Sequence, residues 1–259
     1  MIRNSTLLAA SVAFLATTGL ASADIVTKTV TYDVDGTTFE GYFATNDGVK
    51  GDLPLVVIIH DWDGLTDYEM RRAEMLAQLG FAAFAVDVYG QGVRPTTTEA
   101  KQAESGKLYK DREALRARLN AALAAAEEQD AVDDDEVVVM GYCFGGAVVL
   151  ELARSGADVE GFISFHGGLG TPEGQNYANV EAPVLVLHGS DDPVAPMAQV
   201  AELAEAMNAG GVDFEMQIYS GARHAFTVWD AKGEGARYDA RADLKSWQAM
   251  LEFLNQQIR

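Results

Sequence analysis

A single cysteine occupies a glycine-rich turn of the kind that presents a catalytic nucleophile. Cys143 is the only cysteine of the chain, and residues 141–146 around it have the sequence GYCFGG. An apolar run precedes this turn and a helical pattern follows it, as in a nucleophile elbow, with cysteine in place of the serine of G-x-S-x-G. The turn requires Gly141 and Gly145, because Cβ atoms there would collide with the neighbouring strand and helix. The pattern favours a nucleophile over a small buried hydrophobic residue, the commonest role of a lone cysteine.

The predicted helix begins directly after Cys143. The helix dipole and the unpaired N–H groups of its first turn favour a thiolate, so we expect a pKa below the value of about 8.5 of a free cysteine. The same N–H groups can hold an oxyanion. The turn therefore predicts an activated thiol beside a site for developing negative charge.

A cysteine nucleophile needs a base, and the base needs a carboxylate that orients it. Asp191 and Asp192 lie in an acidic turn after the apolar run 184–187, and His224 follows the run 214–219. Nucleophile, acid and histidine thus occur in the chain order of the α/β-hydrolases. We predict Asp192 as the acid and His224 as the base, although turn formation alone also explains the two aspartates.

Three other histidines also end apparent strands, so position alone does not select His224. These are His60, His166 and His188. Their scatter along the chain gives no metal-ligand spacing, and we expect all three to be structural. The sequence therefore predicts no metal and no organic cofactor.

The order of apolar runs and helical patterns predicts an α/β fold, a mostly parallel sheet with helices on both faces. Residues 25–34 and 38–44 flank Asp35 and Gly36, which predicts an N-terminal antiparallel hairpin. The later runs are continuous, as in strands that are buried on both faces. The expected strands are 55–59, 81–88, 137–140, 161–165, 184–187 and 214–219, and the expected helices are 68–79, 98–128, 147–155, 197–208 and 239–256. Active groups of such a sheet gather beyond the carboxyl ends of the strands.

Composition excludes several classes of protein. The 259 residues include 39 acidic and 19 basic side chains, a net charge of −20, and 48% are hydrophobic. The apolar fraction is too high for a disordered chain. The acidity repels phosphate backbones and anionic headgroups, so we expect no nucleic-acid partner and no stable membrane association. No repeat or linker divides the sequence, and we expect one domain over residues 24–259.

Residues 1–23 have the pattern of a cleavable export signal. Arg3 precedes an apolar run over 7–20, and residues 21–23 are small. The run is shorter than a membrane span needs. We predict cleavage before Asp24 and a periplasmic or secreted mature protein, in which the lone cysteine forms no internal disulfide.

The sequence resembles the dienelactone hydrolase family, α/β-hydrolases that use cysteine rather than serine. The resemblance covers nearly all of residues 24–259 and rests on GYCFGG at 141–146, GSDDPVAP at 189–196, HAF at 224–226 and DVY at 87–89. It implies a triad of Cys143, Asp192 and His224, with Asp191 as a turn residue. It also implies a monomeric enzyme that acts on a small ester or lactone without a cofactor.

The same resemblance assigns roles to the loop HDWDGL at residues 60–65. The family has an acidic residue there, usually Glu, which interacts with the resting cysteine and helps to deprotonate it when substrate arrives. Asp61 occupies this position. The backbone N–H groups of Trp62 and Phe144 would form the oxyanion hole. Apart from the resemblance, Asp61 is also explained as a carboxylate on the approach to a helix.

The substrate pocket departs from the family pattern. Two arginines that hold the carboxylate of dienelactone in the family are replaced by Gln91 and Val228, with Arg94 and Arg223 nearby in the sequence. We therefore expect another substrate, a neutral ester or lactone in an aromatic mouth, although aromatic residues near loops equally fit a core. The aromatic candidates are Trp62, Tyr89, Tyr142, Phe144, Phe226 and Trp229.

The leading hypothesis is an exported thiol hydrolase that forms an acyl-enzyme at Cys143. The alternative is a catalytically inactive periplasmic binding protein on the same fold, since fold alone does not establish chemistry. A redox-sensing thiol is a third hypothesis, which the absence of a second cysteine disfavours.

Overall fold

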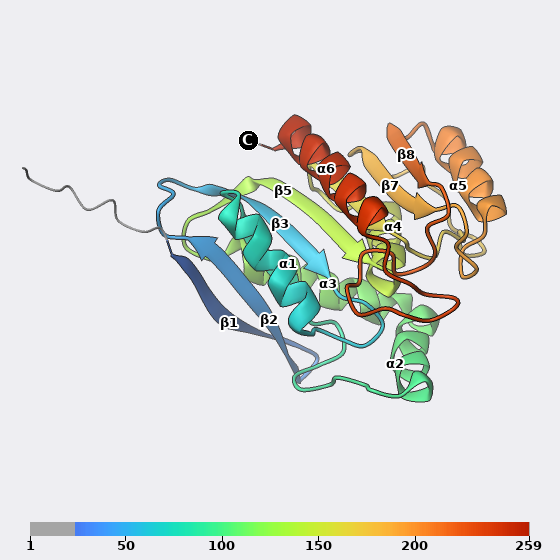
Figure 1. Ribbon diagram of the computed structural model, residues 1–259. Helices are drawn as coiled ribbons and strands as arrows, with labels where there is room; N and C mark the ends of the chain where they lie inside the picture. The colour runs from blue at the N-terminus through green and yellow to red at the C-terminus, as the bar shows by residue number, and fades with distance from the viewer. Residues whose placement is uncertain (1–23, 259) are drawn as a thin grey trace, which may run out of the picture.

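The computed structural model describes residues 24–258, and the predicted export signal, residues 1–23, lies outside them. Eight strands of the described part form one sheet, in the order β1-β2-β4-β3-β5-β6-β7-β8 (Figure 1). The strands are β1 (Ile25–Val34), β2 (Thr37–Asn46), β3 (Leu53–Ile59), β4 (Ala82–Val86), β5 (Val132–Tyr142), β6 (Gly161–Phe165), β7 (Val184–Gly189) and β8 (Phe214–Tyr219). The helices are α1 (Asp67–Gln78), α2 (Thr98–Lys110), α3 (Arg112–Glu127), α4 (Phe144–Arg154), α5 (Met197–Gly210) and α6 (Ala240–Gln257).

The sheet is antiparallel at one edge and parallel elsewhere, which confirms the predicted fold class. β1 pairs with β2 through a turn in which Asp35 and Gly36 both have positive φ, and β2 runs antiparallel to β4. All pairs from β4 across to β8 are parallel. The carboxyl ends of β3, β5, β6, β7 and β8 therefore meet at one edge, where the loops that follow them come together.

Helices cover both faces of the sheet. In Figure 1, α1 and α6 lie in front of the strands, and α3 and α4 lie behind them. Apolar side chains of α3, α4 and α5 pack in one core cluster, and those of α1 and α6 pack in the other. The residues of β4, β6 and β7 are all buried, as the continuous runs predict, but β8 is an edge strand in which only Tyr219 is buried.

The single long helix expected over residues 98–128 is two helices. Asp111 ends α2 and begins α3, with non-helical backbone angles and a side chain that accepts a hydrogen bond from the N–H of Ala114 at 3.0 Å. An aspartate competes for backbone donors in this way and favours the start of a helix. The break places the last turn of α2 and the first turn of α3 next to α4.

Two kinds of feature are absent from residues 24–258. No helix in this range is long and apolar enough to cross a membrane. The same range contains no group of three or more His, Cys, Asp or Glu side chains arranged to hold a metal ion.

Candidate active site

Cys143 lies in a strained turn between β5 and α4. Its φ is 51°, in the left-handed region that a non-glycine residue rarely adopts and that is often found at functional sites. The flanking glycines leave no room for a side chain. A Cβ on Gly145 would lie 2.2 Å from the carbonyl oxygen of Ile59, and a Cβ on Gly141 would lie 2.4 Å from the backbone of Gly145. The turn is therefore closed by backbone packing, as the elbow pattern predicts.

The loops after β7 and β8 bring an acid and a base to this turn. Nε2 of His224 lies 3.0 Å from Sγ of Cys143, and Nδ1 of His224 lies 2.9 Å from Oδ2 of Asp192. The other carboxylate oxygen of Asp192 accepts hydrogen bonds from the N–H groups of Val194 and Ala195, at 2.7 and 3.1 Å. The carboxylate is thus held from one side by the backbone and from the other by the imidazole.

Hydrogen bonds and the charge of His224 favour an ionised Asp192. Burial alone would raise the pKa of this carboxyl, but the hydrogen bond and charge of His224 and the two backbone N–H groups outweigh it and lower the pKa below the ordinary value. With Asp192 as acceptor, Nδ1 of His224 carries a proton and Nε2 is free to accept one. In this tautomer, the unprotonated Nε2 of His224 faces the thiol and can act as its base.

The environment of the thiol differs from the sequence expectation. Burial, the charge of Asp61 and a hydrogen bond to Asp61 raise the pKa of Cys143 well above the ordinary value, and the N–H of Phe144 offsets this only in part. The helix N-terminus is present, but its effect is smaller than those of desolvation and a neighbouring carboxylate. The prediction of a thiolate favoured at rest was therefore wrong, because burial and the charge of Asp61 outweigh the helix N-terminus.

Asp61 connects the thiol to the oxyanion donors. Its Oδ1 accepts a hydrogen bond from the N–H of Trp62, one of the two predicted donors, and the other donor, Phe144 N–H, points at Sγ of Cys143. Burial and the charge of Asp63 raise the pKa of Asp61 to about 6. Both N–H groups are thus engaged within the protein and must be released to bind a substrate oxygen.

The other histidines belong to the framework, as expected. The backbone N–H of Cys143 points to Nδ1 of His166 at 3.2 Å, and Nε2 of His166 lies 2.7 Å from the hydroxyl of Thr227. Burial lowers the pKa of His60, His166 and His188. The neutral His166 therefore holds the nucleophile turn by accepting a hydrogen bond from the backbone N–H of Cys143.

Sequence reasoning missed Glu69, a fully buried carboxylate behind Asp61. Oε1 of Glu69 accepts from the backbone N–H of Asp61 at 3.2 Å, and Oε2 accepts from the backbone and hydroxyl of Thr66 at 3.0 and 2.8 Å. Burial and the charge of Asp61 raise the pKa of Glu69 to about 7. The sequence signal was present, because Thr66 and Glu69 form the capping box of α1.

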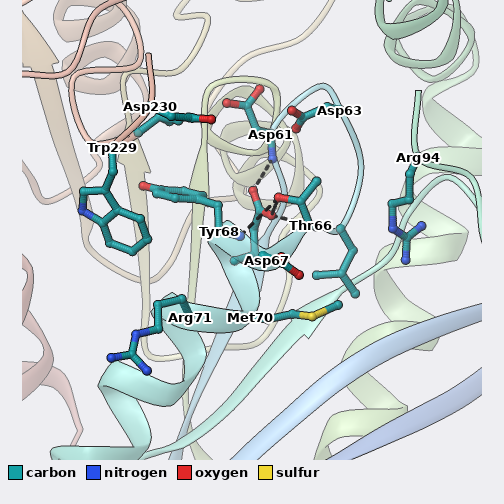
Figure 2. Close-up of a pocket in the computed structure, with 13 residues that line it drawn as sticks. Asp61, Asp63, Thr66, Asp67, Tyr68, Met70, Arg71, Arg94, Trp229 and Asp230 are labelled. Atoms are coloured by element: carbon teal, nitrogen blue, oxygen red, sulfur yellow. Dashed lines mark hydrogen bonds between the residues drawn. The ribbon is translucent and has the colours of Figure 1, made fainter. Parts of the chain in front are cut away.

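A cavity of 780 Å³ opens beside Asp61 on the side of α1 (Figure 2). Five carboxylates line it, against two guanidinium groups, so its walls are acidic. Figure 2 shows Trp229 and Asp230 on the side opposite Arg94. The lining residues are Asp61, Asp63, Leu65, Thr66, Asp67, Tyr68, Glu69, Met70, Arg71, Arg94, Val228, Trp229 and Asp230.

Of the six aromatic residues predicted for the pocket, one lines the cavity. Trp229 is 40% exposed and lines the cavity. Tyr142 and Phe226 are fully buried, with their rings against Phe165 and His166, so they are core residues and the prediction for them was wrong. Tyr89 donates its hydroxyl to the carbonyl of Trp62 at 3.1 Å and supports that loop rather than lining the cavity.

The structure also shows where the two replaced arginine positions and the two nearby arginines lie. Val228 and Arg94 both line the cavity, and Arg94 lies 3.4 Å from Glu40. Gln91 donates to Glu40 at 3.1 Å, outside the lining. Arg223 donates to the carbonyl of Glu234, away from the cavity. The two arginines near the replaced positions are therefore occupied by acidic or carbonyl partners within the protein.

Comparisons with known proteins agree with this geometry. The model of the dienelactone hydrolase family matches residues 39–258. A probable 2-oxo-3-(5-oxofuran-2-ylidene)propanoate lactonase of Bradyrhizobium sp is 30% identical over 188 residues, which cover 69% of this chain and 75% of that protein. The solved structure of m3DLH is 32% identical with a TM-score of 0.85, and that of a dienelactone hydrolase-like promiscuous phosphotriesterase from metagenomic libraries is 34% identical with a TM-score of 0.86. Each comparison covers 91% of this chain and 99% of the solved chain.

Proposed function

Because the chain belongs to the dienelactone hydrolase family, and is a hydrolase that acts on esters or lactones, we propose that it works through a Cys143, His224 and Asp192 triad with an acyl-enzyme intermediate. One observation carries the proposal, the continuous contact from Sγ through the imidazole to the carboxylate, with separations of 3.0 and 2.9 Å. These are hydrogen-bonding distances for a nucleophile, its base and the group that orients the base.

In the proposed reaction, Sγ of Cys143 attacks the carbonyl carbon of the substrate and its proton passes to Nε2 of His224. The N–H groups of Phe144 and Trp62 receive the oxyanion. His224 then gives the proton to the departing alkoxide oxygen as the C–O bond breaks, leaving a thioester. Water attacks this thioester with His224 as base, and the thiol regains its proton as the acid product leaves.

Asp61 controls where the thiol proton resides before substrate arrives. The thiol has one proton and two acceptors, the carboxylate of Asp61 and Nε2 of His224. While the S–H group donates a hydrogen bond to the Asp61 carboxylate, the thiol keeps its proton and is unreactive, and transfer of that proton to His224 begins the reaction. A substrate carbonyl that takes the N–H of Trp62 also removes a hydrogen bond from Asp61, so binding and activation are coupled through this carboxylate.

Replacing Asp61 by Asn is expected to speed alkylation of Cys143 by iodoacetamide about tenfold near pH 7.5. Asp61, with a pKa of about 6, is charged at this pH and opposes the thiolate, so removing the charge lowers the pKa of the thiol. One pKa unit corresponds to a tenfold change in thiolate fraction. The measurement is the alkylation rate from pH 5 to 9, in which the variant should be faster above pH 6 and the difference should shrink as the pH falls through the pKa of Asp61.

Asp63→Asn is the control, because Asp63 affects the thiol less and is paired with Lys101 at 3.1 Å. It should change the alkylation rate less than Asp61→Asn does. An Asp61→Asn protein that is alkylated no faster than the unchanged protein would contradict the role given to this carboxylate.

The substrate class is tested with a short 4-nitrophenyl ester, an activated lactone and a dienelactone. We expect turnover of the first two, and a weak response to dienelactone, because acidic groups outnumber basic ones in the large cavity. The relative described as a phosphotriesterase makes a phosphotriester a useful fourth substrate. No turnover of any of them, together with tight binding of a small ligand, would favour the inactive binding protein instead.

We also propose that the protein is exported to the periplasm or secreted. The support is the sequence pattern of residues 1–23, with Arg3 before an apolar run and small residues ahead of Asp24. The intact mass of the protein recovered from the native host should correspond to a chain that begins at Asp24. A mass that includes residue 1 would contradict this.

A further inference from the structure

A second, smaller pocket lies beside the nucleophile turn, on the side of α3 and α4. Its volume is 170 Å³, and it is lined by Tyr109, Arg112, Ala147, Arg154, Gly168 and Gly170. The N–H of Ala147 donates to the carbonyl of Cys143 at 3.2 Å, and the ring of Tyr109 packs against that of Phe144 at 5.4 Å. The pocket is therefore next to the residues that carry the proposed chemistry, and it is large enough for several water molecules or a short carbon chain.

The charge of this pocket is opposite to that of the large cavity. Its lining has two guanidinium groups and no carboxylate, in a chain of net charge −20. The balancing carboxylate, Glu151, is fully buried behind the lining. It is shared by Arg112, Arg116 and Arg154, at 2.7, 2.5 and 2.9 Å, so the cluster of these four side chains keeps an excess positive charge.

Arg112 is held in place with donors to spare. One nitrogen donates to Glu151 at 2.7 Å, and the guanidinium lies over the ring of Tyr109 at 5.6 Å. Within residues 24–258 its other N–H groups have no hydrogen-bond partner. A guanidinium that is fixed in advance and retains free donors matches the two oxygens of a carboxylate, and binds it with little loss of side-chain freedom.

The two spaces receive different parts of the substrate. Val228 and Trp229, which line the large cavity, lie on the loop that carries His224, and His224 protonates the leaving group. The leaving group therefore lies on the side of the large cavity. Residues of α2, α3, α4 and the loop after β6 line the small pocket, and none of them lines the large cavity, which leaves the small pocket for the acyl part.

We propose that the pocket of Tyr109, Arg112 and Arg154 binds a carboxylate on the acyl part of the substrate, so that half-esters of short dicarboxylic acids are preferred over neutral esters of equal length. The proposal rests on the hydrolase function given above. In this proposal, Arg112 and Arg154 supply the basic groups for a charged substrate, in place of positions 91 and 228, which hold Gln and Val.

The test compares mono-4-nitrophenyl adipate with 4-nitrophenyl hexanoate, which share a leaving group and a six-carbon acyl chain and differ in the terminal carboxylate. The ratio of their kcat/KM values should favour the adipate about tenfold, and Arg112→Gln should abolish this preference while leaving hexanoate hydrolysis within about twofold. Arg112→Lys should retain part of the preference for the adipate, because lysine keeps the positive charge but lacks the parallel N–H donors of the guanidinium. Added salt should reduce the preference.

Arg116→Gln is the matched control. Arg116 is one turn further along α3 and binds the same Glu151, but it does not line the pocket. Its loss should leave the ratio unchanged. An equal fall in the ratio for Arg112→Gln and Arg116→Gln, or a ratio near one in the unchanged protein, would overturn the proposal.

A second measurement separates this proposal from the hydrolase function. Monomethyl adipate is titrated calorimetrically into Cys143→Ala protein, which needs no turnover. Binding that weakens about tenfold or more in the Cys143→Ala, Arg112→Gln double variant supports the carboxylate site even if no ester is hydrolysed. Equal affinity, or no binding, in the two proteins contradicts the site even if esters are hydrolysed well.

Discussion

Cys143→Ala is expected to lower kcat/KM for a short 4-nitrophenyl ester by about four to six orders of magnitude. The loss is this large because Sγ forms the bond to the acyl carbon, and within residues 24–258 it is the only atom hydrogen-bonded to Nε2 of His224. The thiol contacts its base at 3.0 Å, whereas an alanine methyl group accepts no acyl group and gives no proton. The measurement is steady-state turnover of the purified variant, with 4-nitrophenolate release followed over hours.

Two further measurements distinguish loss of the nucleophile from loss of the folded structure. Cys143→Ser keeps the size of the side chain and should retain a small but measurable fraction of activity, since a hydroxyl can still donate to His224. Circular dichroism and the thermal midpoint should be nearly unchanged in both variants, because Cys143 is only partly buried and both replacements are small. An alanine variant that retains full activity would refute the thiol mechanism.

Asp192→Asn is expected to lower kcat by about three to four orders of magnitude with little change in KM. The carboxylate of Asp192 accepts the Nδ1 proton of His224 at 2.9 Å, which leaves Nε2 unprotonated toward the thiol. The backbone N–H groups of Val194 and Ala195 already occupy the other oxygen. Asparagine therefore presents its amide N–H to the imidazole, which favours the wrong tautomer and withdraws the base.

Asp191→Asn is the matched control for Asp192→Asn. The two aspartates are adjacent in the chain, but Asp191 is exposed and accepts only from the hydroxyl of Ser190 at 3.0 Å. Its replacement should change kcat less than about twofold. Equal losses for the two variants would show that the turn as a whole, rather than the Asp192 carboxylate, accounts for the effect.

The parallel sheet and the nucleophile turn were predictable because local sequence determines both. Continuous apolar runs require strands with two buried faces, and GYCFGG requires a turn that only glycine can close. A Cβ atom added to Gly145 or Gly141 would lie 2.2 or 2.4 Å from neighbouring backbone atoms, so only glycine fits at these two positions. The strand β8 was predicted, but its exposure at the sheet edge and the break at Asp111 were not, because both depend on neighbours that a local pattern does not contain.

The chain order of cysteine, aspartate and histidine was determined by the sequence itself, and so were the types of these residues. The sequence also predicted Asp192 rather than Asp191 as the acid, and the structure places its carboxylate 2.9 Å from His224. Only the tertiary structure decided how strongly burial and Asp61 raise the pKa of the thiol, and that Glu69 supports Asp61 from behind. It also put Tyr142 and Phe226 in the core and Arg112 beside the nucleophile. The physical reason is that electrostatic and desolvation effects depend on distance and burial, and residues far apart in sequence acquire both only when the strands assemble.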